Sequence, residues 1–254
     1  MFINFDIKEC VSAKKKLNRI QQMRNIYKTV FSSSSSIGNC TNLYRKICPE
    51  TCREFFEGYF KYAEQNITLD ICDRGLTTSE FIKMCLQYKE VAERNTKERF
   101  PIETYIYAML CHIIVETFEG QKKEEDFKKY LESLGCECIS YDGKIDARYS
   151  IDIKAVKKGK EQAIQIKPIS FFLSNAYDTV QDKLKMQKNY HEVLEKFGIE
   201  TFYAVYSIDE DTREIKWLKN GKRFVFTLKD LLNEDNTFKS PDFFRECTQD
   251  FLPI

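Results

Sequence analysis

The sequence lacks several features that would assign it to a common class of protein. No run of about 18 apolar residues occurs, so no membrane-spanning helix is predicted. The chain has only 2 histidines, His112 and His191, too few for most hydrolase triads or histidine-based metal sites. No glycine-rich phosphate loop is present, which excludes the nucleotide sites that such loops build.

A strong net charge is also missing. Lys and Arg number 40 and Asp and Glu 39 in 254 residues, so the overall charge does not argue for nucleic acid. A protein that binds nucleic acid in a cleft nevertheless needs positive charge only along that cleft. A hydrophobic content of 43% and a charged content of 31% are typical of a soluble globular protein. Because the first residues lack the basic start and long apolar core of a signal peptide, we expect a cytoplasmic protein.

Ten cysteines are scattered along the chain within hydrophobic patterns. In a long cytoplasmic chain, such cysteines are expected to be reduced and buried, without disulfides. Cys48 and Cys52, together with Cys40 and Cys72, could instead hold zinc. Their spacing is not the usual tight pair of a zinc site, so we favour reduced thiols.

The first hundred residues are predicted to be mostly helical. Apolar residues at helical spacing predict a basic helix over 7–31 and further helices over 41–66 and 77–93. The third of these helices begins with a capping box formed by Thr77 and Glu80. We expect residues 1–100 to form a helical N-terminal region that either helps to grip a duplex or is purely structural.

Acidic residues lie close to the start of the second part of the chain. Pro101 is expected to begin a helix that Gly120 ends, and a new helix is expected from Gln121. Glu124 falls on the same helical stripe as Phe127 and Leu131. A carboxylate on an apolar stripe needs a partner, unless it lies in a solvated first turn where the helix dipole favours it. Rivals for an acidic role here are Glu116, Glu119 and Glu125.

Residues 150–167 are predicted to form a β-hairpin closed by the two-residue turn Lys158-Gly159. Lys157 then pairs with Lys160, and counting back along both strands sets Asp152 across from Gln165. The alternation of a strand puts Gln165 and Lys167 on one face, and Ile164 and Ile166 on the other.

Strands and a long helix are predicted on both sides of this hairpin. A strand over 136–141 and a turn at Asp142-Gly143 precede it. A parallel crossover follows, with a helix over 177–197 between strands 161–167 and 201–207. The apolar stripe of that helix is read as Tyr177, Val180, Leu184, Gln187, Tyr190, Val193, Leu194 and Phe197. A second hairpin, 214–218 with 223–228, and a helix near 229–233 end an α/β fold.

Asp152, Gln165 and Lys167 bring a carboxylate, an amide oxygen and an ammonium to one patch of sheet. This combination suits a divalent metal and a phosphate. Lys167 could orient or deprotonate a water, or stabilise the charge on phosphorus; the last role requires no lowering of an ordinary lysine pKa near 10.4. The same three residues could equally be a cross-strand polar pair and an edge lysine on a solvated sheet face.

The order of these features resembles the PD-(D/E)XK nuclease superfamily, and most of all its type II restriction endonucleases. The resemblance covers about residues 103–207 and rests on Gly120-x₃-Glu124-x₂-Phe127-x₃-Leu131, a strand, Asp152, a twelve-residue interval, and Gln165-Ile166-Lys167. Asp152 matches the metal-binding aspartate, Lys167 the lysine, and Glu124 the glutamate on the preceding helix. The chain departs from the pattern at Ser150-Ile151, which replaces the usual proline, and at Gln165, where Asp or Glu is usual.

The resemblance implies a nuclease core over 101–254, with a restriction-endonuclease-like mixed sheet flanked by helices. It implies a Mg²⁺-dependent enzyme that cleaves double-stranded DNA at a specific sequence, as a homodimer, with a cognate DNA methyltransferase as genetic partner. Expected catalytic residues are Asp152, Gln165, Lys167 and Glu124, and the metal is expected at Asp152, Gln165, Glu124 and Ile166. Because an amide adds no charge, Glu124 or Asp146 would have to supply more.

Contacts to DNA are expected from residues on and before the crossover helix, namely Ser170, Asn175, Lys183, Lys185 and Lys188. Two other functions stay open. One is a structure-specific or modified-DNA nuclease built on the same core. The other, suggested by Gln165, is a DNA-binding protein whose nuclease site has decayed.

Overall fold

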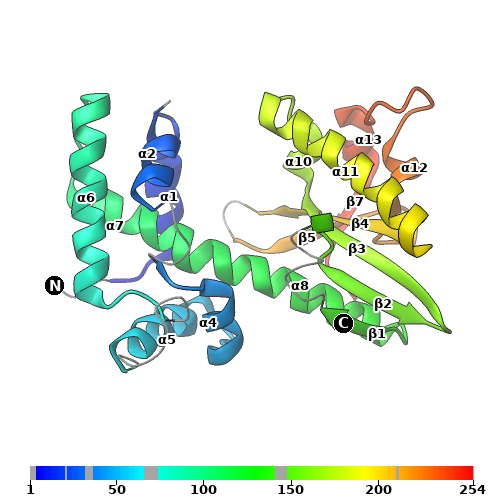
Figure 1. The fold of residues 1–254 in the computed structure, drawn as a ribbon, viewed down its shortest axis with the longest axis horizontal. Coiled ribbons are helices and arrows are strands. Elements are labelled where there is room, and N and C mark those ends of the chain that lie inside the picture. The colour runs from blue at the N-terminus through cyan, green and yellow to red at the C-terminus, as the bar shows by residue number, and fades with distance from the viewer. Residues whose placement is uncertain are drawn as a thin grey trace. The chain divides into compact units, whose positions relative to one another are not determined.

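The computed structural model describes residues 4–20, 22–31, 37–65, 74–140, 148–209 and 212–253. The chain divides into two compact units, Met1–Lys122 and Lys123–Ile254. The boundary was expected after residue 100, but helix α7 (Ile102–Leu110) packs against the earlier helices α1 and α6 and so belongs to the first unit (Figure 1). No helix within the described ranges is long and apolar enough to cross a membrane.

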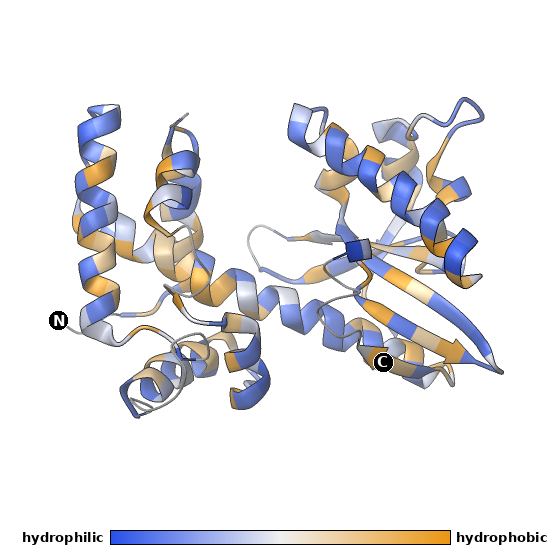
Figure 2. Cartoon of the chain, in the orientation of Figure 1, coloured by the Kyte–Doolittle hydropathy of each residue, from blue (hydrophilic) through white to orange (hydrophobic). Residues whose placement is uncertain are grey.

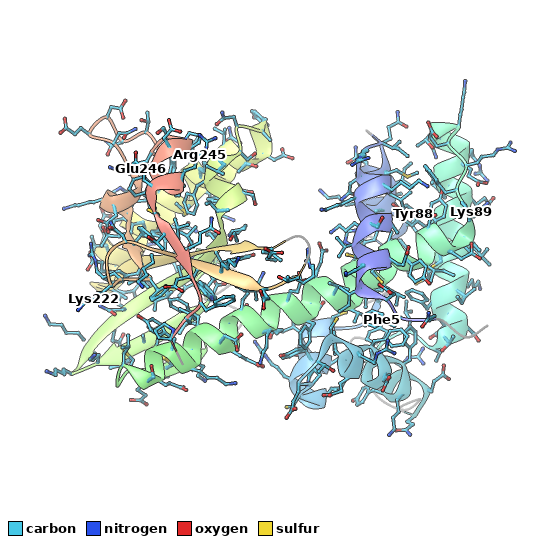
Figure 3. The ribbon with its side chains drawn as sticks, turned by 180° about the vertical axis from the view of Figure 1, so that it is seen from behind. Phe5, Tyr88, Lys89, Lys222, Arg245 and Glu246 are labelled. Carbon is cyan, nitrogen blue, oxygen red and sulfur yellow. The ribbon has the colours of Figure 1, made fainter. Side chains whose placement is uncertain are left out.

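The first unit is helical, as predicted. Besides α7 its elements are α1 (Ile7–Asn18), α2 (Met23–Val30), α4 (Cys40–Ile47), α5 (Cys52–Gln65), α6 (Thr78–Thr96), the π-helix η1 (Cys111–Val115) and the start of α8 (Glu116–Ser133). Aromatic side chains fill the interior. Tyr88 points from α6 toward α2, where it contacts Tyr27 and Phe31, whereas Lys89 points away and pairs with Glu93 (Figure 3).

Two predicted helices of this unit are each split in two. The helix expected over 7–31 breaks between α1 and α2. The helix expected over 41–66 ends at Ile47, because Cys48 adopts the left-handed conformation (φ 49°) and Pro49 cannot continue a helix. The third prediction is confirmed: Thr77 and Glu80 form the capping box of α6.

The helix break predicted at Gly120 is wrong. The chain stays helical from Ile102 to Ser133 through α7, η1 and α8, with Gly120 inside α8. A glycine in a helix interior costs only about 1 kcal/mol relative to alanine, which packing of the helix easily offsets. Glu124 therefore lies in the middle of a helix, and a solvated first turn no longer explains its place on an apolar stripe.

The second unit is a mixed α/β structure with a 7-stranded, mostly antiparallel sheet. Its elements after α8 are β1 (Glu137–Ser140), β2 (Ile153–Lys157), β3 (Lys160–Pro168), α10 (Ile169–Leu173), α11 (Tyr177–Phe197), β4 (Glu200–Ile208), β5 (Ile215–Lys219), β6 (Phe226–Thr227), α12 (Leu228–Leu231), α13 (Pro241–Glu246) and β7 (Thr248–Asp250). The strand order is β1-β2-β3-β4-β5-β7, with β6 also paired to β4. The Asp142-Gly143 turn lies outside the described residues.

The central hairpin is confirmed. Lys157 pairs with Lys160, and both turn residues have positive φ, 50° at Lys158 and 73° at Gly159, as a tight hairpin turn requires. Polar and apolar residues follow one another along β2 and β3 (Figure 2). This alternation turns one face of the hairpin toward the core of the unit.

The parallel crossover is also confirmed, with β3 beside β4 and α11 between them in sequence. One face of the sheet packs on α8 through Phe127, Tyr130 and Leu131, which cluster with Ile164 and Ala204. The other face packs on the crossover side, where Tyr203 and Val205 cluster with Met186 and Tyr190 of α11 and with Phe172 of α10. Each face of the sheet is therefore covered by a helix.

The predicted helix over 177–197 is confirmed, but its buried face matches the prediction only at Tyr190 and Val193. The residues of α11 that are buried are Lys183, Met186, Asn189, Tyr190 and Val193. Tyr177 is 77% exposed and Phe197 55% exposed, although both were assigned to the core stripe. Because two polar residues are buried on this helix, the apolar pattern misjudges the face that meets the sheet.

The second predicted hairpin is wrong beyond a single bridge between Asn220 and Arg223. Strand β5 pairs with β4 and β7 instead, while β6 crosses to β4, where Phe226 stands beside Tyr203. Phe226 is fully buried in the cluster that contains Tyr203. The burial of this ring favours the pairing with β4.

Two glycine substitutions test the corrected helix boundaries. An added Cβ at Gly120 meets nothing within 4 Å, so Gly120→Ala should stabilise the helix by about 0.5–1 kcal/mol. Gly198, which ends α11 with φ 65°, is equally uncrowded, yet Gly198→Ala should destabilise by about 1–2 kcal/mol through its backbone alone. Thermal unfolding followed by circular dichroism should shift in opposite directions. A lower midpoint for Gly120→Ala would contradict the continuous helix.

Candidate active site

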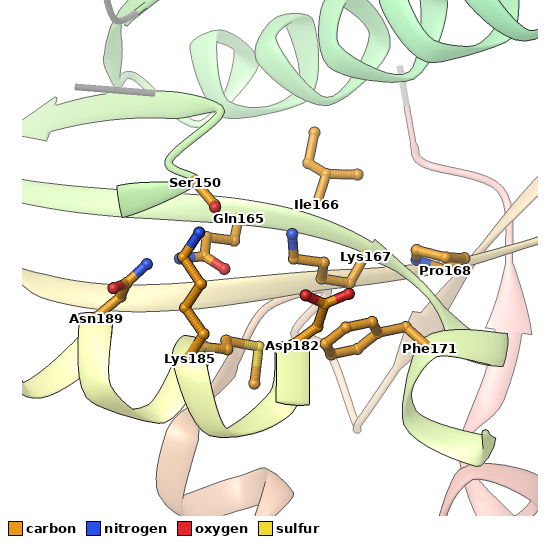
Figure 4. A pocket seen from close by; sticks show the side chains of 10 residues that line it. Ser150, Gln165, Ile166, Lys167, Pro168, Phe171, Asp182, Lys185 and Asn189 are labelled. Carbon is orange, nitrogen blue, oxygen red and sulfur yellow. The ribbon is translucent and has the colours of Figure 1, made fainter. Parts of the chain in front are cut away.

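Strand β3 presents two polar side chains on one face, as predicted. Gln165 and Lys167 point toward α11, and Ile166 points to the opposite side of the strand (Figure 4). Ile166 packs with the cluster on the α8 side of the sheet. The alternation of the strand therefore separates a polar pair from the core that anchors it.

Asp152 is attached to β3 by two hydrogen bonds, one on each side of Gln165. Its N–H donates to the Ile164 carbonyl at 2.9 Å, and its Oδ2 accepts the Ile166 N–H at 2.5 Å. The regular pairing ends at Ile153 with Ile164, so Asp152 is not strictly opposite Gln165 as predicted. The carboxylate takes the place of the main-chain carbonyl that would continue the ladder.

Gln165 is a buried amide that is only half satisfied. Its side chain is 1% exposed, and Nε2 donates to the Tyr149 carbonyl at 3.0 Å. That carbonyl can only accept, so the amide nitrogen must face it and Oε1 must face away. Within the described residues Oε1 has no hydrogen-bond donor, and neither does the buried hydroxyl of Tyr203, its neighbour across the parallel pair. An unsatisfied buried oxygen costs about 1–3 kcal/mol, which points to a partner from outside the chain.

The segment that leads into Asp152 is held in an uncommon conformation. Ser150 has φ 56°, a left-handed geometry that costs free energy in a residue other than glycine. On one side of it Arg148 pairs with Glu192 of α11 at 3.3 Å, and on the other Asp152 is bonded to β3. A hydrogen bond from Lys196, together with Arg148, holds the pKa of Glu192 below its usual range. Residues 148–152 are thus pinned between α11 and the strand.

The side chains of Gln165 and Lys167 line a cavity of about 380 Å³. Its lining comprises Ser150, Gln165, Ile166, Lys167, Pro168, Phe171, Asp182, Lys185, Met186 and Asn189. The last four follow the i, i+3, i+4, i+7 spacing of one helix face, so α11 forms a whole wall of the cavity. The volume lies within the range of small-ligand sites, about 300–1,000 Å³.

Charged groups face this cavity without neutralising one another. Lys167 on β3 and Asp182 and Lys185 on α11 point toward the shared space (Figure 4). In the described part of the chain none of the three forms an ion pair, and the ammonium of Lys167 lies 5.8 Å from the centre of the Phe171 ring. Two cations, one anion and an unsatisfied amide oxygen suit a phosphate with a hydrated cation.

Sequence reasoning missed Asp182 and Asn189. Their spacing, with Lys185 between them, is a readable signal of a polar helix face. The signal becomes informative only once that face is known to meet the sheet.

The other predicted acids are not brought to the cavity. Glu124 lies on α8, which covers the opposite face of the sheet, and it does not line the cavity. Glu116 belongs to the first unit, where it bonds His112 and Lys14; burial would raise its pKa, but these two partners lower it. Asp146 lies outside the described residues.

The described residues contain no group of three His, Cys, Asp or Glu side chains that could hold a metal by themselves. Cys40, Cys48 and Cys52, which were considered as zinc ligands, therefore do not form such a group among the described residues. Cys72, the fourth candidate, lies outside the described ranges. Cys10, Cys52, Cys85 and Cys111 are buried free thiols, as predicted, whereas Cys48 is exposed and Cys40, Cys136, Cys138 and Cys247 are only partly buried. A metal at the β3 cavity would therefore depend on amide and main-chain oxygens as well as carboxylates.

Lys183 does not fit its predicted role as a DNA contact. It is 7% exposed, and its Nζ donates to the carbonyls of Phe172 at 2.7 Å and Ser174 at 2.8 Å. Burial lowers its pKa. The ammonium joins the end of α10 to α11 and so helps to orient the helix that walls the cavity. The other predicted DNA contacts, Ser170, Asn175, Lys185 and Lys188, are exposed.

Comparison of the chain with known protein families, with curated proteins and with solved structures finds no match.

The half-satisfied amide predicts a pH-dependent defect. Gln165→Glu places a carboxylate against the Tyr149 carbonyl with no donor nearby, so the pKa of the new carboxyl should be raised in the folded protein. Its protonated form can donate to that carbonyl, so stability should be near normal at pH 5 and fall by about 1–3 kcal/mol at pH 8. Urea unfolding at both pH values, without added metal, measures the effect.

Gln162→Glu is the matched control, because Gln162 lies on the same strand and is partly exposed. It should show little pH dependence. Equal behaviour of the two variants would contradict the burial and pairing assigned to Gln165.

Proposed function

We propose that this chain is a Mg²⁺-dependent endonuclease that cleaves double-stranded DNA, of the PD-(D/E)XK type that its sequence resembles. One observation carries the proposal. Gln165 and Lys167 project from one strand into a single cavity, and the carboxylate of Asp152 is fixed to the residue between them. The three side chains that the motif requires are thus neighbours in space.

The architecture around the site supports the proposal. A helix (α8), an antiparallel meander (β1, β2, β3), a crossover helix (α11) and a parallel strand (β4) follow one another in the order that the resemblance implies. The two helices cover opposite faces of the sheet. This arrangement favours a restriction-endonuclease-like core for the second unit.

The oxygen donors of the site suit Mg²⁺, which prefers hard oxygen ligands. Asp152 offers a carboxylate and Gln165 an amide oxygen that has no other partner among the described residues. In a strand the N–H and C=O of one residue point to the same side, so the carbonyl of Ile166 faces the Asp152 side, beyond the end of β2. When bound, Mg²⁺ would polarise a phosphoryl oxygen and make water more acidic.

Lys167 contributes positive charge next to these oxygens. An ammonium aimed into the cavity stabilises the negative charge that a phosphoryl group carries during hydrolysis. Lys185 adds a second positive charge from the opposite wall. Around the cavity, Ser170, Asn175 and Lys188 are exposed polar residues of the kind that contact DNA phosphates.

Cleavage of both strands at a symmetric sequence requires two sites, which a homodimer supplies most simply. We therefore propose a sequence-specific type II restriction endonuclease that acts as a homodimer in the cytoplasm, with a cognate DNA methyltransferase protecting the host.

Lys167→Ala should abolish cleavage while leaving DNA binding nearly intact, because the ammonium acts on the reacting phosphate and not on the whole duplex. The measurement is digestion of a plasmid of known sequence with Mg²⁺, together with fluorescence anisotropy on a duplex that contains the site. Lys160→Ala, at the exposed turn end of the same strand, should cleave normally. Full cleavage by Lys167→Ala would overturn the site assignment.

The same digestion separates the related functions. Discrete bands from the parent protein support sequence-specific cleavage. Products that depend on branches or on methylation favour a structure-specific or modified-DNA nuclease. Salt-sensitive binding without any cleavage favours a decayed site, for which the neutral Gln165 is the motivating feature.

A further inference from the structure

The β3 side of the cavity is short of negative charge. Gln165 is neutral, so Asp152 is the one carboxylate that the hairpin contributes next to Lys167. Mg²⁺ is usually held by one or two carboxylates together with substrate phosphates, and two nearby lysines oppose a cation. A second carboxylate would correct this imbalance.

The cavity lining already contains such a group. In the described part of the chain, Asp182 is the one carboxylate among the residues that line the cavity. It projects from α11 toward Lys167 (Figure 4). The acids expected from sequence do not compete for this place, since Glu124 lies on the helix that covers the opposite face and Glu116 is bonded to His112 and Lys14.

Helix stability does not explain Asp182. Aspartate has a low helix propensity. The helix dipole favours an acid only in the first turn, and Asp182 lies beyond the first turn of α11. Lys185, three residues further on, does not pair with it among the described contacts, although such a pair would stabilise the helix. Asp182 therefore contributes neither a favourable helix propensity nor an ion pair to the stability of α11.

The position of Asp182 is well defined. The next residue, Lys183, bonds the carbonyls of Phe172 and Ser174 and so ties this turn of α11 to α10. One turn further on, Met186 is buried in the cluster between α11 and the sheet. Asp182 therefore faces Lys167 from a fixed helix and not from a loop.

We propose that Asp182 is a catalytic residue that supplies, from the crossover helix, the second negative charge that Gln165 withholds from the cation site. This inference rests on the proposed nuclease function. Asp182 then reaches the cavity from α11, Gln165 and Lys167 reach it from β3, and Asp152 is bonded to the Ile166 N–H of that strand.

Metal binding tests the proposal without any substrate. Isothermal titration calorimetry of the full chain with Mg²⁺, and with Mn²⁺ as a second probe, should show affinity about 10-fold or more weaker for Asp182→Asn than for the parent. Glu195→Gln removes a charge from the exposed opposite side of the same helix and should bind like the parent. Since Asp182 is exposed and unpaired, thermal unfolding should show that Asp182→Asn folds normally.

Keeping the charge on α11 gives the sharper result. Asp182→Glu retains a carboxylate at the same place on the helix, so its Mg²⁺ affinity should lie well above that of Asp182→Asn, and DNA cleavage should be retained with it. Equal Mg²⁺ affinity of Asp182→Glu and Asp182→Asn would contradict a role for the charge of Asp182.

Two outcomes would overturn the proposal in distinguishable ways. If Asp182→Asn binds Mg²⁺ like the parent while Asp152→Asn does not, Asp182 has no part in the site and the proposed function stands. If the parent binds neither Mg²⁺ nor Mn²⁺ and does not cleave DNA, the proposed function fails together with the role of Asp182.

Discussion

The second unit depends on how Asp152 is joined to strand β3. Its N–H meets the Ile164 carbonyl and its carboxylate meets the Ile166 N–H, so one residue closes the end of the β2–β3 ladder. A charged acceptor makes the second of these bonds stronger than an ordinary one. The same contacts place the carboxylate beside Gln165 and Lys167. The hydrogen bonds that end the β2–β3 pairing are therefore the same ones that position the carboxylate of the polar site.

A buried amide gives the site its unusual character. The carbonyl of Tyr149 requires a donor, which glutamine has and an ionised glutamate lacks, so local hydrogen bonding explains the neutral residue at position 165. Its unsatisfied oxygen is costly inside a protein without an external partner. Negative charge that the strand cannot hold is available across the cavity at Asp182. The site is best understood as an arrangement of two walls, a strand and a helix.

Much of the fold was predictable, because it follows from local rules. Left-handed turn residues and alternating side chains specify the hairpin, and a long amphipathic segment between two apolar strands specifies the crossover. The face of α11 was predictable only in part. Tyr190 and Val193 are buried as expected, but Lys183 and Asn189 are buried as well, and Lys183 can be buried because two carbonyls at the end of α10 accept its hydrogen bonds. The helix break predicted at Gly120 was wrong for a related reason, because packing and not helix propensity decides whether a helix continues.

The sequence by itself determined the order of elements, the register of the hairpin and the pairing of Gln165 with Lys167 on one face, because these depend on neighbours along the chain. Only the tertiary structure decided that Asp152 closes the ladder with its side chain, that β6 and β7 join different strands, and that Asp182 lines the same cavity as Gln165. These contacts join residues that lie far apart in the chain. They depend on how the strands and helices of this unit pack together, which the periodicity of the sequence does not encode.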